Sequence, residues 1–536
     1  MPPTTAICAA LIVFCLVRAI LRRVSCVLDN IPGPARKSLL TGNVTQYHDP
    51  DGWEFHQELE EKYGQVVKVH GLIGDRHLFV FDPAALHSIL VKDQDLYEEM
   101  PKFIGMNALL FGKGISSAIR DEHRKYRKIM MPAFSTANLR ALVPLFYEVA
   151  ERARDGLISP YVLHGPQTLD FNSVLCRTSL ELIGHTGIGY SFDPMIPGQE
   201  QTDRYGQSLR ALTSTAFELS LAIPLIPFIL KIPFPSFLRF MIKLIPSPAL
   251  HKLRDLVDFT NATATQLVRD REVAIKNGEL DVKHDAKDLM SLLMKNNMST
   301  EGQMHLSDDE LVACTSMIIH AATDTTSSAM SRFLHILAMH PDVQEKLRAE
   351  ILAASDHLDH DTLVALPYLD SVVREILRLY PTTSPGMYRE ACEDTVLPLN
   401  TPITGVDGTV MNTIHVPKGT SIYIAIAAAN HNKQIWGEDT LEFRPERWTN
   451  GKAESVTVKL CGVYGNTMTF LGGGRSCIGF KFALLEMKIV MCVLLRAFRF
   501  SEPDPRIKWR MTGVVPSPTV DNQPSLPIRI EHLNAL

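Results

Sequence analysis

The pattern that most constrains the fold is a long helical stretch around residue 320. Ser307 followed by Glu310 is typical of a capping box, which starts a helix, and Pro341 ends the pattern. A helix from Asp308 to Met339 would be about 48 Å long at 1.5 Å per residue. We expect a helix of this length to be central, so that the other elements pack around it.

Two further regions predict strands. Residues 65–70 and 77–81 are β-branched and aromatic runs that predict a hairpin, and residues 396–426 form a second β-rich region. Most of residues 83–380 has helical spacing. The predicted fold class is therefore mainly α with a smaller β region.

Length and composition favour one large domain. The chain has 536 residues, 46% of them hydrophobic, which is ample for a large core. No linker-like stretch interrupts it past residue 50, so residues 51–536 are predicted to form a single domain. A net charge of −5 gives no indication of nucleic acid binding.

The cysteines exclude two kinds of protein. Nine cysteines without a C-x-x-C pair do not form a disulfide framework, and they suit a reducing compartment. A zinc site built on Cys461 and Cys477 fails on their spacing. The sequons at Asn43, Asn261 and Asn297 are taken as chance matches.

The N-terminal segment predicts a membrane anchor. Residues 4–24 hold an uncharged apolar core, and Arg18, Arg22 and Arg23 follow that core. The length suits one spanning helix, and the charge after the core directs the next domain to the cytosolic side. A cleaved signal peptide, the alternative, would carry its charge before the core. We expect a single-pass anchor in the endoplasmic reticulum membrane, followed over residues 25–50 by a basic, proline-rich hinge.

A second apolar region covers residues 217–248. It contains six prolines, so it cannot be one spanning helix. Either it forms short helices of the core, or it is a surface segment that dips into the bilayer beside an access channel. The sequence leaves both interpretations open.

A single cysteine stands in the glycine-rich stretch FLGGGRSCIG, residues 470–479. A buried helix is predicted from about Ile478, so Cys477 would lie at its N-terminus, where the helix dipole stabilises an anion. Arg475 adds positive charge, and both effects are expected to lower the pKa of the thiol. The glycines would let the backbone approach a large planar group, and Phe470 could cover that group. The stretch predicts a thiolate held against something flat.

Two helical segments carry further candidate residues. The stretch AATDTT, residues 321–326, has small side chains that would let a large group lie against the long helix, with Asp324 and Thr325 at the same place. The alternative is a threonine-rich turn of an ordinary core helix. Glu375 and Arg378 share a helix face at i, i+3, although surface pairs of this kind are common and weak.

Together these residues resemble the cytochrome P450 family. The haem-loop pattern F-x-x-G-x-R-x-C-x-G of that family is matched by Phe470, Gly473, Arg475, Cys477 and Gly479. Glu375 and Arg378 match its E-x-x-R pair, and Arg447 in FRPERW matches the arginine that locks that pair. The stretch AATDTTSS matches the oxygen-activating segment of the family. EHRKYRKIMMPAFS matches the helix whose arginine, here Arg127, meets a haem propionate. IPGP matches the hinge of microsomal members. The resemblance covers essentially the whole chain and is greatest to fungal members.

The resemblance implies a haem b whose iron is ligated by the Cys477 thiolate, which favours O–O cleavage. It implies that Thr325 hydrogen-bonds dioxygen, that Asp324 helps to bring protons, and that Ala321 and Ala322 leave space for O₂. The implied partners of the haem propionates are Arg127, Arg475, Arg389 and, less directly, His123. Glu375, Arg378 and Arg447 would be a structural network. Two positions depart from the family pattern, because His123 replaces a tryptophan and Ala322 replaces a glycine.

The resemblance also implies partners. Electrons would come from NADPH through a flavoprotein reductase with an acidic face, docked on a cationic surface. The members of that surface would be Arg120, Arg124, Lys125, Arg127, Lys128, Lys481 and Lys488. A solvated helix face is the alternative. The substrate would be apolar, with terpenoid secondary metabolism as the expectation, and the pocket walls would be residues 103–119, 317–322, 383–387 and 514–518.

Three functions follow as alternatives. The first is a membrane-bound monooxygenase that inserts one atom of O₂ into an apolar small molecule. The second is a haem-thiolate isomerase that rearranges peroxides without a reductase, which the presence of Asp324 and Thr325 disfavours. The third is a non-catalytic haem sensor, which would not need Thr325.

Overall fold

The structure is a computed structural model that describes residues 26–199, 204–219, 226–229, 231, 235–277, 288–298, 305–383, 386–451, 456–511 and 513–533. The chain divides into two compact units. The first unit comprises residues 1–100, 383–442 and 453–476, and the second comprises residues 101–382, 443–452 and 477–536. The boundary at residue 476 divides the glycine-rich stretch just before Cys477.

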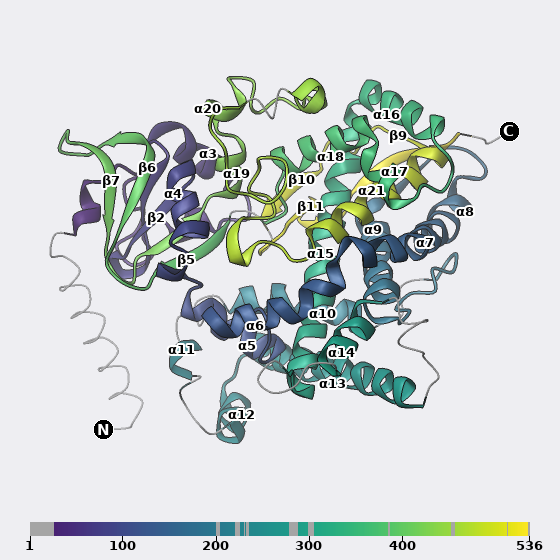
Figure 1. Cartoon of the computed structure of the whole chain (residues 1–536), viewed down its shortest axis with the longest axis horizontal. Coiled ribbons are helices and arrows are strands. Elements are labelled where there is room, and N and C mark those ends of the chain that lie inside the picture. Colours follow the sequence, from purple (N-terminus) through teal and green to yellow (C-terminus); the bar gives the residue numbers. More distant parts are fainter. Residues whose placement is uncertain are drawn as a thin grey trace. The chain divides into compact units, whose positions relative to one another are not determined.

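The first unit contains the larger sheet, whose strand order is β1-β2-β8-β5-β3 (Figure 1). Its strands are β1 Val66–His70, β2 Arg76–Val80, β3 Tyr97–Glu98, β5 Met387–Ala391 and β8 Ser421–Ile424. β1 and β2 form the predicted antiparallel hairpin, and β8 lies parallel to β2. A separate hairpin pairs β6 Thr395–Thr404 with β7 Val410–Val416, which confirms the second β-rich region.

Short helices complete this unit. They are α2 Val44–Tyr47, α3 Trp53–Lys62, α4 Pro83–His87, α19 Ile426–Asn430 and α20 Lys433–Trp436. The proline-rich lead-in is fixed to the sheet, because the Pro32 carbonyl accepts a hydrogen bond from Lys68 N at 2.9 Å. A Cβ atom on Gly33 would lie 1.9 Å from the Lys68 carbonyl oxygen, so this close approach requires glycine.

The second unit is mainly helical and is built round α15 Asp308–Met339, whose bounds match the prediction. The capping box is present, since Ser307 Oγ accepts from Glu310 N at 3.3 Å and Glu310 Oε2 accepts from Ser307 N at 2.8 Å. Pro341 begins the next helix, which ends α15 because the residue before a proline disfavours helical geometry. α15 packs against α9, α13 and α21, which cover its buried faces (Figure 1).

The other elements of this unit surround α15. Its longer helices are α5 Pro101–Phe111, α6 Arg120–Met130, α7 Thr136–Ala153, α9 Phe171–Ile183, α10 Arg204–Glu218, α13 Pro248–Lys276, α14 Leu289–Met298, α16 Pro341–Ala353, α18 Pro367–Leu379 and α21 Phe480–Ala497. Its short helices are α8 Ser159–Val162, α11 Ile226–Ile229, α12 Pro235–Leu244 and α17 His360–Ala365. Two three-stranded sheets, β4-β13-β9 and β10-β11-β12, use β4 Gln167–Asp170, β9 Phe498–Ser501, β10 Lys508–Met511, β11 Pro516–Val520, β12 Gln523–Pro524 and β13 Pro527–His532.

The apolar region of residues 217–248 is not one helix. Its described part contains α11 and α12, and α12 is not a core helix, because Phe240 is 56% and Leu244 60% exposed. The structure therefore favours the surface interpretation for α12.

Within the described ranges, no single helix has the length and apolar character needed to span a bilayer. One bent pair, Arg120–Phe134 with Thr136–Val162, passes that test by length and composition. The predicted anchor at residues 4–24 lies outside the described residues.

Candidate active site

The glycines of the cysteine loop serve two different purposes. Gly473 has φ +70°, and a Cβ atom there would lie 1.6 Å from the Leu90 carbonyl oxygen. A Cβ atom on Gly472 would lie 2.0 Å from the Cys461 carbonyl oxygen. These two glycines are therefore required by packing inside the first unit, which explains them without a planar group.

Gly479 differs from those glycines. It precedes α21 with φ −93°, a value that any residue adopts. Among the described residues, a Cβ atom there would meet only Phe134 Cε1, at an ordinary 3.6 Å. Neither the backbone nor the protein packing requires glycine at 479, so the backbone here stays open to a group from outside the chain.

The side chain of Cys477 is accessible. Among the cysteines that the structure describes, it is the exposed one, yet burial raises the pKa of its thiol. A metal ion that binds there would deprotonate the thiol.

The expected lowering of the Cys477 pKa is wrong for the polypeptide alone. The Gly479 N–H and the charge of Arg127 do act to lower the pKa, but burial outweighs them. Arg475, the expected source of positive charge, instead forms an ion pair with Glu98 at 2.5 Å. The cation that acts on the thiol is Arg127, which comes from another helix.

The middle of α15 is open at the predicted oxygen-activating segment. Ala321 is exposed, and Ala322, Asp324 and Thr325 are half-buried, although most of the helix is buried. Thr325 Oγ1 donates a hydrogen bond to the Ala321 carbonyl at 2.8 Å, a contact that bends helices. An ordinary core helix would cover this turn with side chains, so the accessible surface disfavours that alternative.

Two of the predicted pocket walls in the second unit contact α15. The Phe111 ring lies 4.9 Å from the His320 ring, between ring centres. Ser328 Oγ donates to the Pro516 carbonyl at 2.7 Å. The predicted wall at residues 383–387 belongs to the first unit, and residues 384–385 lie outside the described residues.

In the second unit, the residues predicted to bind the haem propionates lie on helix α6. Arg127 is half-buried, and burial lowers its pKa. His123 is buried on the same helix. Tyr126 Oη donates to Glu310 Oε1 at 2.5 Å, which fixes α6 to the first turn of α15.

The other two residues predicted to bind the haem propionates, Arg389 and Arg475, lie in the first unit. On β5, Arg389 is buried and its Nη1 donates to Glu99 Oε1 at 2.6 Å. Its Nη2 is buried without a hydrogen-bond partner in the described part of the chain. A buried guanidinium N–H without an acceptor is costly, so Arg389 retains a donor for an anionic group. The sequence did not predict that Glu98 pairs with Arg475 or that Glu99 pairs with Arg389. In each pair the two residues are about 300 positions or more apart in the sequence.

The structure brings Glu375, Arg378 and Arg447 together. Glu375 and Arg378 are fully buried and joined by two bonds of 2.9 Å, and Arg447 Nε donates to Glu375 Oε1 at 3.1 Å. The sequence did not predict that Trp448 Nε1 donates to Glu375 Oε2 at 2.9 Å. The Phe443–Trp448 segment therefore contacts the Glu375 carboxylate through Trp448 as well as through Arg447.

A second buried carboxylate was missed. Glu486 on α21 is fully buried, and its Oε1 accepts from Ser179 Oγ at 2.8 Å. Ser179 Oγ also lies 3.3 Å from the Ala322 carbonyl in the oxygen-activating segment. These residues are up to 307 positions apart, so no local pattern could have revealed them.

We predict that Glu486→Gln makes stability less dependent on pH. Burial raises the Glu486 pKa to about 8 from its ordinary 4.5. Between these values the folded chain keeps a proton that the unfolded chain has lost, so wild-type stability falls as pH rises. Glutamine cannot ionise, so the free energy of unfolding of the variant relative to that of wild type should increase by about 4 kcal/mol between pH 5 and pH 8.5.

Urea unfolding of wild type and Glu486→Gln at pH 5 and pH 8.5 measures this difference. The exposed Glu393→Gln change is the control and should show no such dependence. Equal stability differences at the two pH values would contradict a neutral Glu486.

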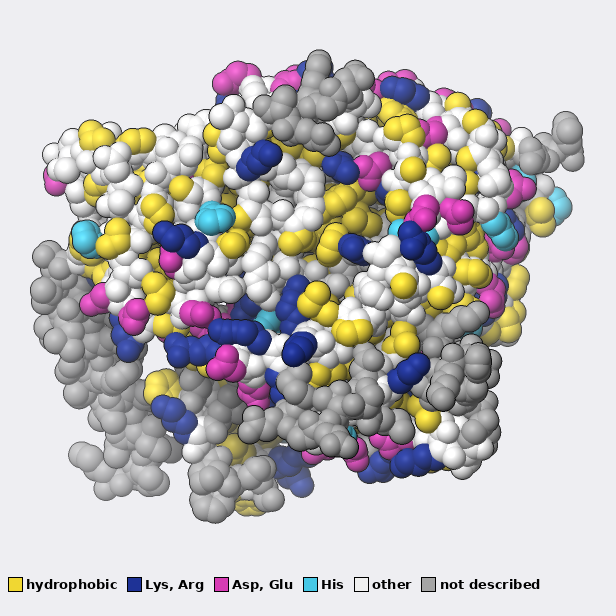
Figure 2. Space-filling view, in the orientation of Figure 1, with side chains coloured by type: hydrophobic (Ala, Val, Ile, Leu, Met, Phe, Trp, Pro, Cys, Tyr) yellow, Lys and Arg dark blue, Asp and Glu magenta, His cyan; other side chains and the backbone are white. Residues whose placement is uncertain are grey.

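One member of the predicted docking surface is wrong. Lys488 is buried on α21, and its Nζ donates to Asp370 Oδ1 at 2.8 Å, so it cannot face a partner. Basic side chains do gather over α6 on the face shown in Figure 2. The exposed members of the predicted set are Arg120, Arg124, Lys128 and Lys481.

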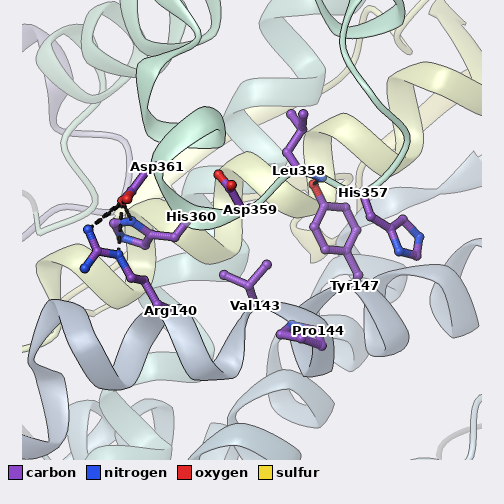
Figure 3. Close-up of a pocket in the computed structure, with 9 residues that line it drawn as sticks. All are labelled: Arg140, Val143, Pro144, Tyr147, His357, Leu358, Asp359, His360 and Asp361. Carbon is purple, nitrogen blue, oxygen red and sulfur yellow. Dashed lines mark hydrogen bonds and ion pairs between the residues drawn. The ribbon is translucent and has the colours of Figure 1, made fainter.

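A cavity of about 390 Å³ lies between α7 and the segment that enters α17 (Figure 3). Its polar side chains are already paired, since Arg140 holds Asp361 at 2.9 Å and the Tyr147 ring stacks on His357. None of the residues predicted for the active site lines this cavity. It is therefore separate from the predicted substrate pocket.

Comparison with known proteins identifies the family. Residues 32–521 match the family Cytochrome P450. The chain is 43% identical to cytochrome P450 monooxygenase 91 of Postia placenta over 515 residues, which cover 94% of each chain. It is 37% identical to a ganoderic acid synthetase of Ganoderma lucidum over 525 residues, 95% of this chain and 94% of the relative. It is 35% identical to the monooxygenase eriI of Hericium erinaceus, with 95% and 94% covered. The chain belongs to the cytochrome P450 family and is a cytochrome P450 monooxygenase.

Membership implies a haem, and the residues fit one. The second unit offers an accessible thiol at Cys477, an open backbone at Gly479 and an uncovered turn of α15 at Ala321. The first unit offers the unpartnered Nη2 of Arg389. When bound, the haem supplies the redox chemistry that activates O₂. The residues of the chain would supply the iron ligand and the cations for the propionates.

Proposed function

We propose that the protein is a membrane-bound monooxygenase that inserts one oxygen atom of O₂ into an apolar small molecule, with electrons from NADPH through a flavoprotein reductase. The observation that carries the proposal is the accessible turn of α15 that presents Thr325 and Asp324. A haem sensor has no use for an acid and a hydroxyl at that place, and a peroxide-rearranging isomerase needs no proton delivery from them.

The chain's own contribution to catalysis is the handling of protons. The Thr325 hydroxyl is held by the Ala321 carbonyl at 2.8 Å, so its oxygen is oriented and can accept a hydrogen bond from outside the helix. Asp324 is the neighbouring acid, and the two side chains lie on adjacent positions of one turn. We assign Cys477 to the haem iron, and Arg127, Arg389 and Arg475 to the propionates. His123 is a further donor toward them.

We predict that Thr325→Ala uncouples electron supply from oxygenation. The methyl group of alanine neither holds nor passes a proton, so reduced oxygen should leave as peroxide. The measurement is NADPH consumed, product formed and peroxide released by the full chain with reductase. Product per NADPH should fall about tenfold or more, since a positioned proton donor is worth 10²–10⁴ in rate.

Thr326→Ala is the matched control, because Thr326 is the next residue on α15 and is buried. It should keep the wild-type ratio of product to peroxide. Turnover of a hydroperoxide without reductase, or an unchanged ratio in Thr325→Ala, would overturn the proposal.

Reductase docking is proposed on the cationic surface formed by Arg120, Arg124, Lys128 and Lys481. Lys481 Nζ donates to Thr136 Oγ1 at 3.2 Å, so the start of α21 lies beside the start of α7. Attraction of this kind raises the association rate and is weakened by salt. A rate of reduction that does not fall with added salt would count against it.

Membrane attachment is proposed on two grounds. The apolar segment at residues 4–24 suits a single-pass anchor, with the catalytic domain on the cytosolic side of the endoplasmic reticulum. α12 adds exposed apolar side chains, which suit contact with a bilayer surface; these are Phe237, Phe240, Met241 and Leu244. Recovery of the full chain in the soluble fraction of a cell lysate would contradict the proposal.

The substrate class is proposed to be apolar and of the terpenoid type. The name of the Ganoderma lucidum relative, ganoderic acid synthetase, refers to the making of an organic acid. We infer a comparable place in secondary metabolism for this chain. Loss of a metabolite on gene deletion is the measurement that identifies the substrate.

A further inference from the structure

Arg332 is a cation of α15 without an acid partner. It forms no hydrogen bond or ion pair with any residue that the structure describes. Instead, its guanidinium carbon lies 3.5 Å from the centre of the Trp509 ring and 4.3 Å from the centre of the Tyr380 ring. Its side chain is half-buried, and burial lowers its pKa to about 9. A guanidinium that has lost much of its water without gaining an acceptor is an incomplete arrangement.

The stacking leaves the edge of the guanidinium available. The five N–H donors of arginine lie in the guanidinium plane, whereas a cation–π contact uses its face. The contacts with the two rings therefore use none of the hydrogen-bond donors of Arg332. A planar acceptor with two oxygens, such as a carboxylate, matches a free guanidinium edge by two parallel hydrogen bonds.

The platform itself is fixed. Trp509 Nε1 donates to His335 Nδ1 at 2.9 Å, and the two rings are stacked. Burial and the charge of Arg332 lower the pKa of His335 to about 4, so this histidine is neutral and accepts the bond. His335 therefore holds Trp509 in place and does not compete with Arg332 for an anion.

Arg332 lies on the same face of α15 as Thr325. The two residues are seven positions apart, which is nearly two full turns and about 10.5 Å along the axis. Between them, Ser328 donates to the carbonyl of Pro516 on β11, part of a predicted pocket wall. Trp509 lies on β10, where it pairs with Pro518 of that same wall. Arg332 thus contacts the strand β10 that pairs with the predicted wall at residues 514–518.

We propose that Arg332 binds a carboxylate of the substrate about 10 Å along α15 from Thr325. The substrate class is then an apolar molecule with one acidic end, held so that its apolar part extends toward the oxygen-activating turn. The proposal deepens the proposed function, since it names a chemical feature of the substrate of that site.

The test compares fatty carboxylates of 12 to 18 carbons with their methyl esters. Binding is followed by the change in the absorption spectrum of the ferric, full-length enzyme, without NADPH or reductase. The measurement therefore stays informative even if the proposed oxygenation fails. The wild type should bind the best acid at least tenfold more tightly than its ester.

Arg332→Gln should weaken binding of the acid tenfold or more and leave binding of the ester within twofold. Arg332→Lys, which keeps the charge without the planar edge, should lie between them. Arg510→Gln is the control, because Arg510 is the neighbour of Trp509 on β10 and is bound by Asn522 at 2.9 Å. It should bind both probes like the wild type.

Three results would overturn the proposal. The first is a wild type that shows no preference for the acid, including one that binds neither probe. The second is an Arg332→Gln protein that loses acid and ester alike. The third is an Arg510→Gln protein that binds the acid as weakly as Arg332→Gln does, which would indicate a general effect of charge. The wild-type comparison requires no variant, so the proposal can fail even if Arg332→Gln does not fold.

Discussion

Replacing Cys477 by serine is expected to abolish thiolate ligation of the haem and, with it, all monooxygenase activity. A serine hydroxyl keeps the size of the side chain but is not deprotonated near neutral pH, whereas metal binding converts a thiol to its thiolate even where burial raises its pKa. The thiolate is the ligand that favours O–O cleavage in this family. The expected loss of activity is at least 10³-fold, which is more than 4 kcal/mol of transition-state stabilisation.

The measurement is the reduced CO-difference spectrum, taken with the haem content of the purified protein. Wild type should give the thiolate-type band and Cys477→Ser should not. Cys461→Ser is the matched control from the same region, since Cys461 is half-buried and its sulfur lies 4.0 Å from that of Met468. A thiolate-type band in Cys477→Ser would show that another residue holds the iron.

The sequence predicted best what is determined locally. The bounds of α15 follow from Ser307, Glu310 and Pro341, which act within one turn of the helix ends. The hairpin of β1 and β2 also follows from neighbouring residues. The same holds for the contact between Glu375 and Arg378, because i, i+3 spacing alone puts two side chains on one helix face.

The sequence failed where the outcome depends on a partner far along the chain. Burial raises the Cys477 pKa and outweighs the nearby Gly479 N–H, and the cation that lowers this pKa is Arg127, 350 positions earlier, and not Arg475 two positions away. Lys488 seemed to extend a cationic surface, but Asp370 on α18 pairs with it inside the protein. Arg332 gave no sequence signal, because its significance lies in the absence of an acid among the described residues round it.

Replacing Glu375 by leucine is expected to unfold the protein or to destabilise it by about 3–5 kcal/mol. Glu375 accepts hydrogen bonds from Arg378, Arg447 and Trp448, and both Glu375 and Arg378 are fully buried. Leucine removes the carboxylate that accepts two hydrogen bonds from the buried Arg378 guanidinium, and breaking a buried pair in this way costs far more than the ion pair itself contributes.

Arg378→Met should cost less than Glu375→Leu. The carboxylate that remains would keep the donors of Arg447 and Trp448, so it is not left unpaired. Comparing the stabilities of the two variants therefore distinguishes a network centred on Glu375 from a simple pair. In a simple pair, removing either residue would cost the same stability.

Urea unfolding measures the free energy of unfolding of each of the two variants, and haem retention serves as a second signal. Lys433→Ala is the control, because Lys433 pairs with Glu438 at 2.8 Å but both side chains are exposed, 57% and 87%. That exposed pair should contribute no more than about 1 kcal/mol. A Glu375→Leu protein as stable as Lys433→Ala would contradict the network, since the buried Arg378 guanidinium could then lose the Glu375 carboxylate without cost.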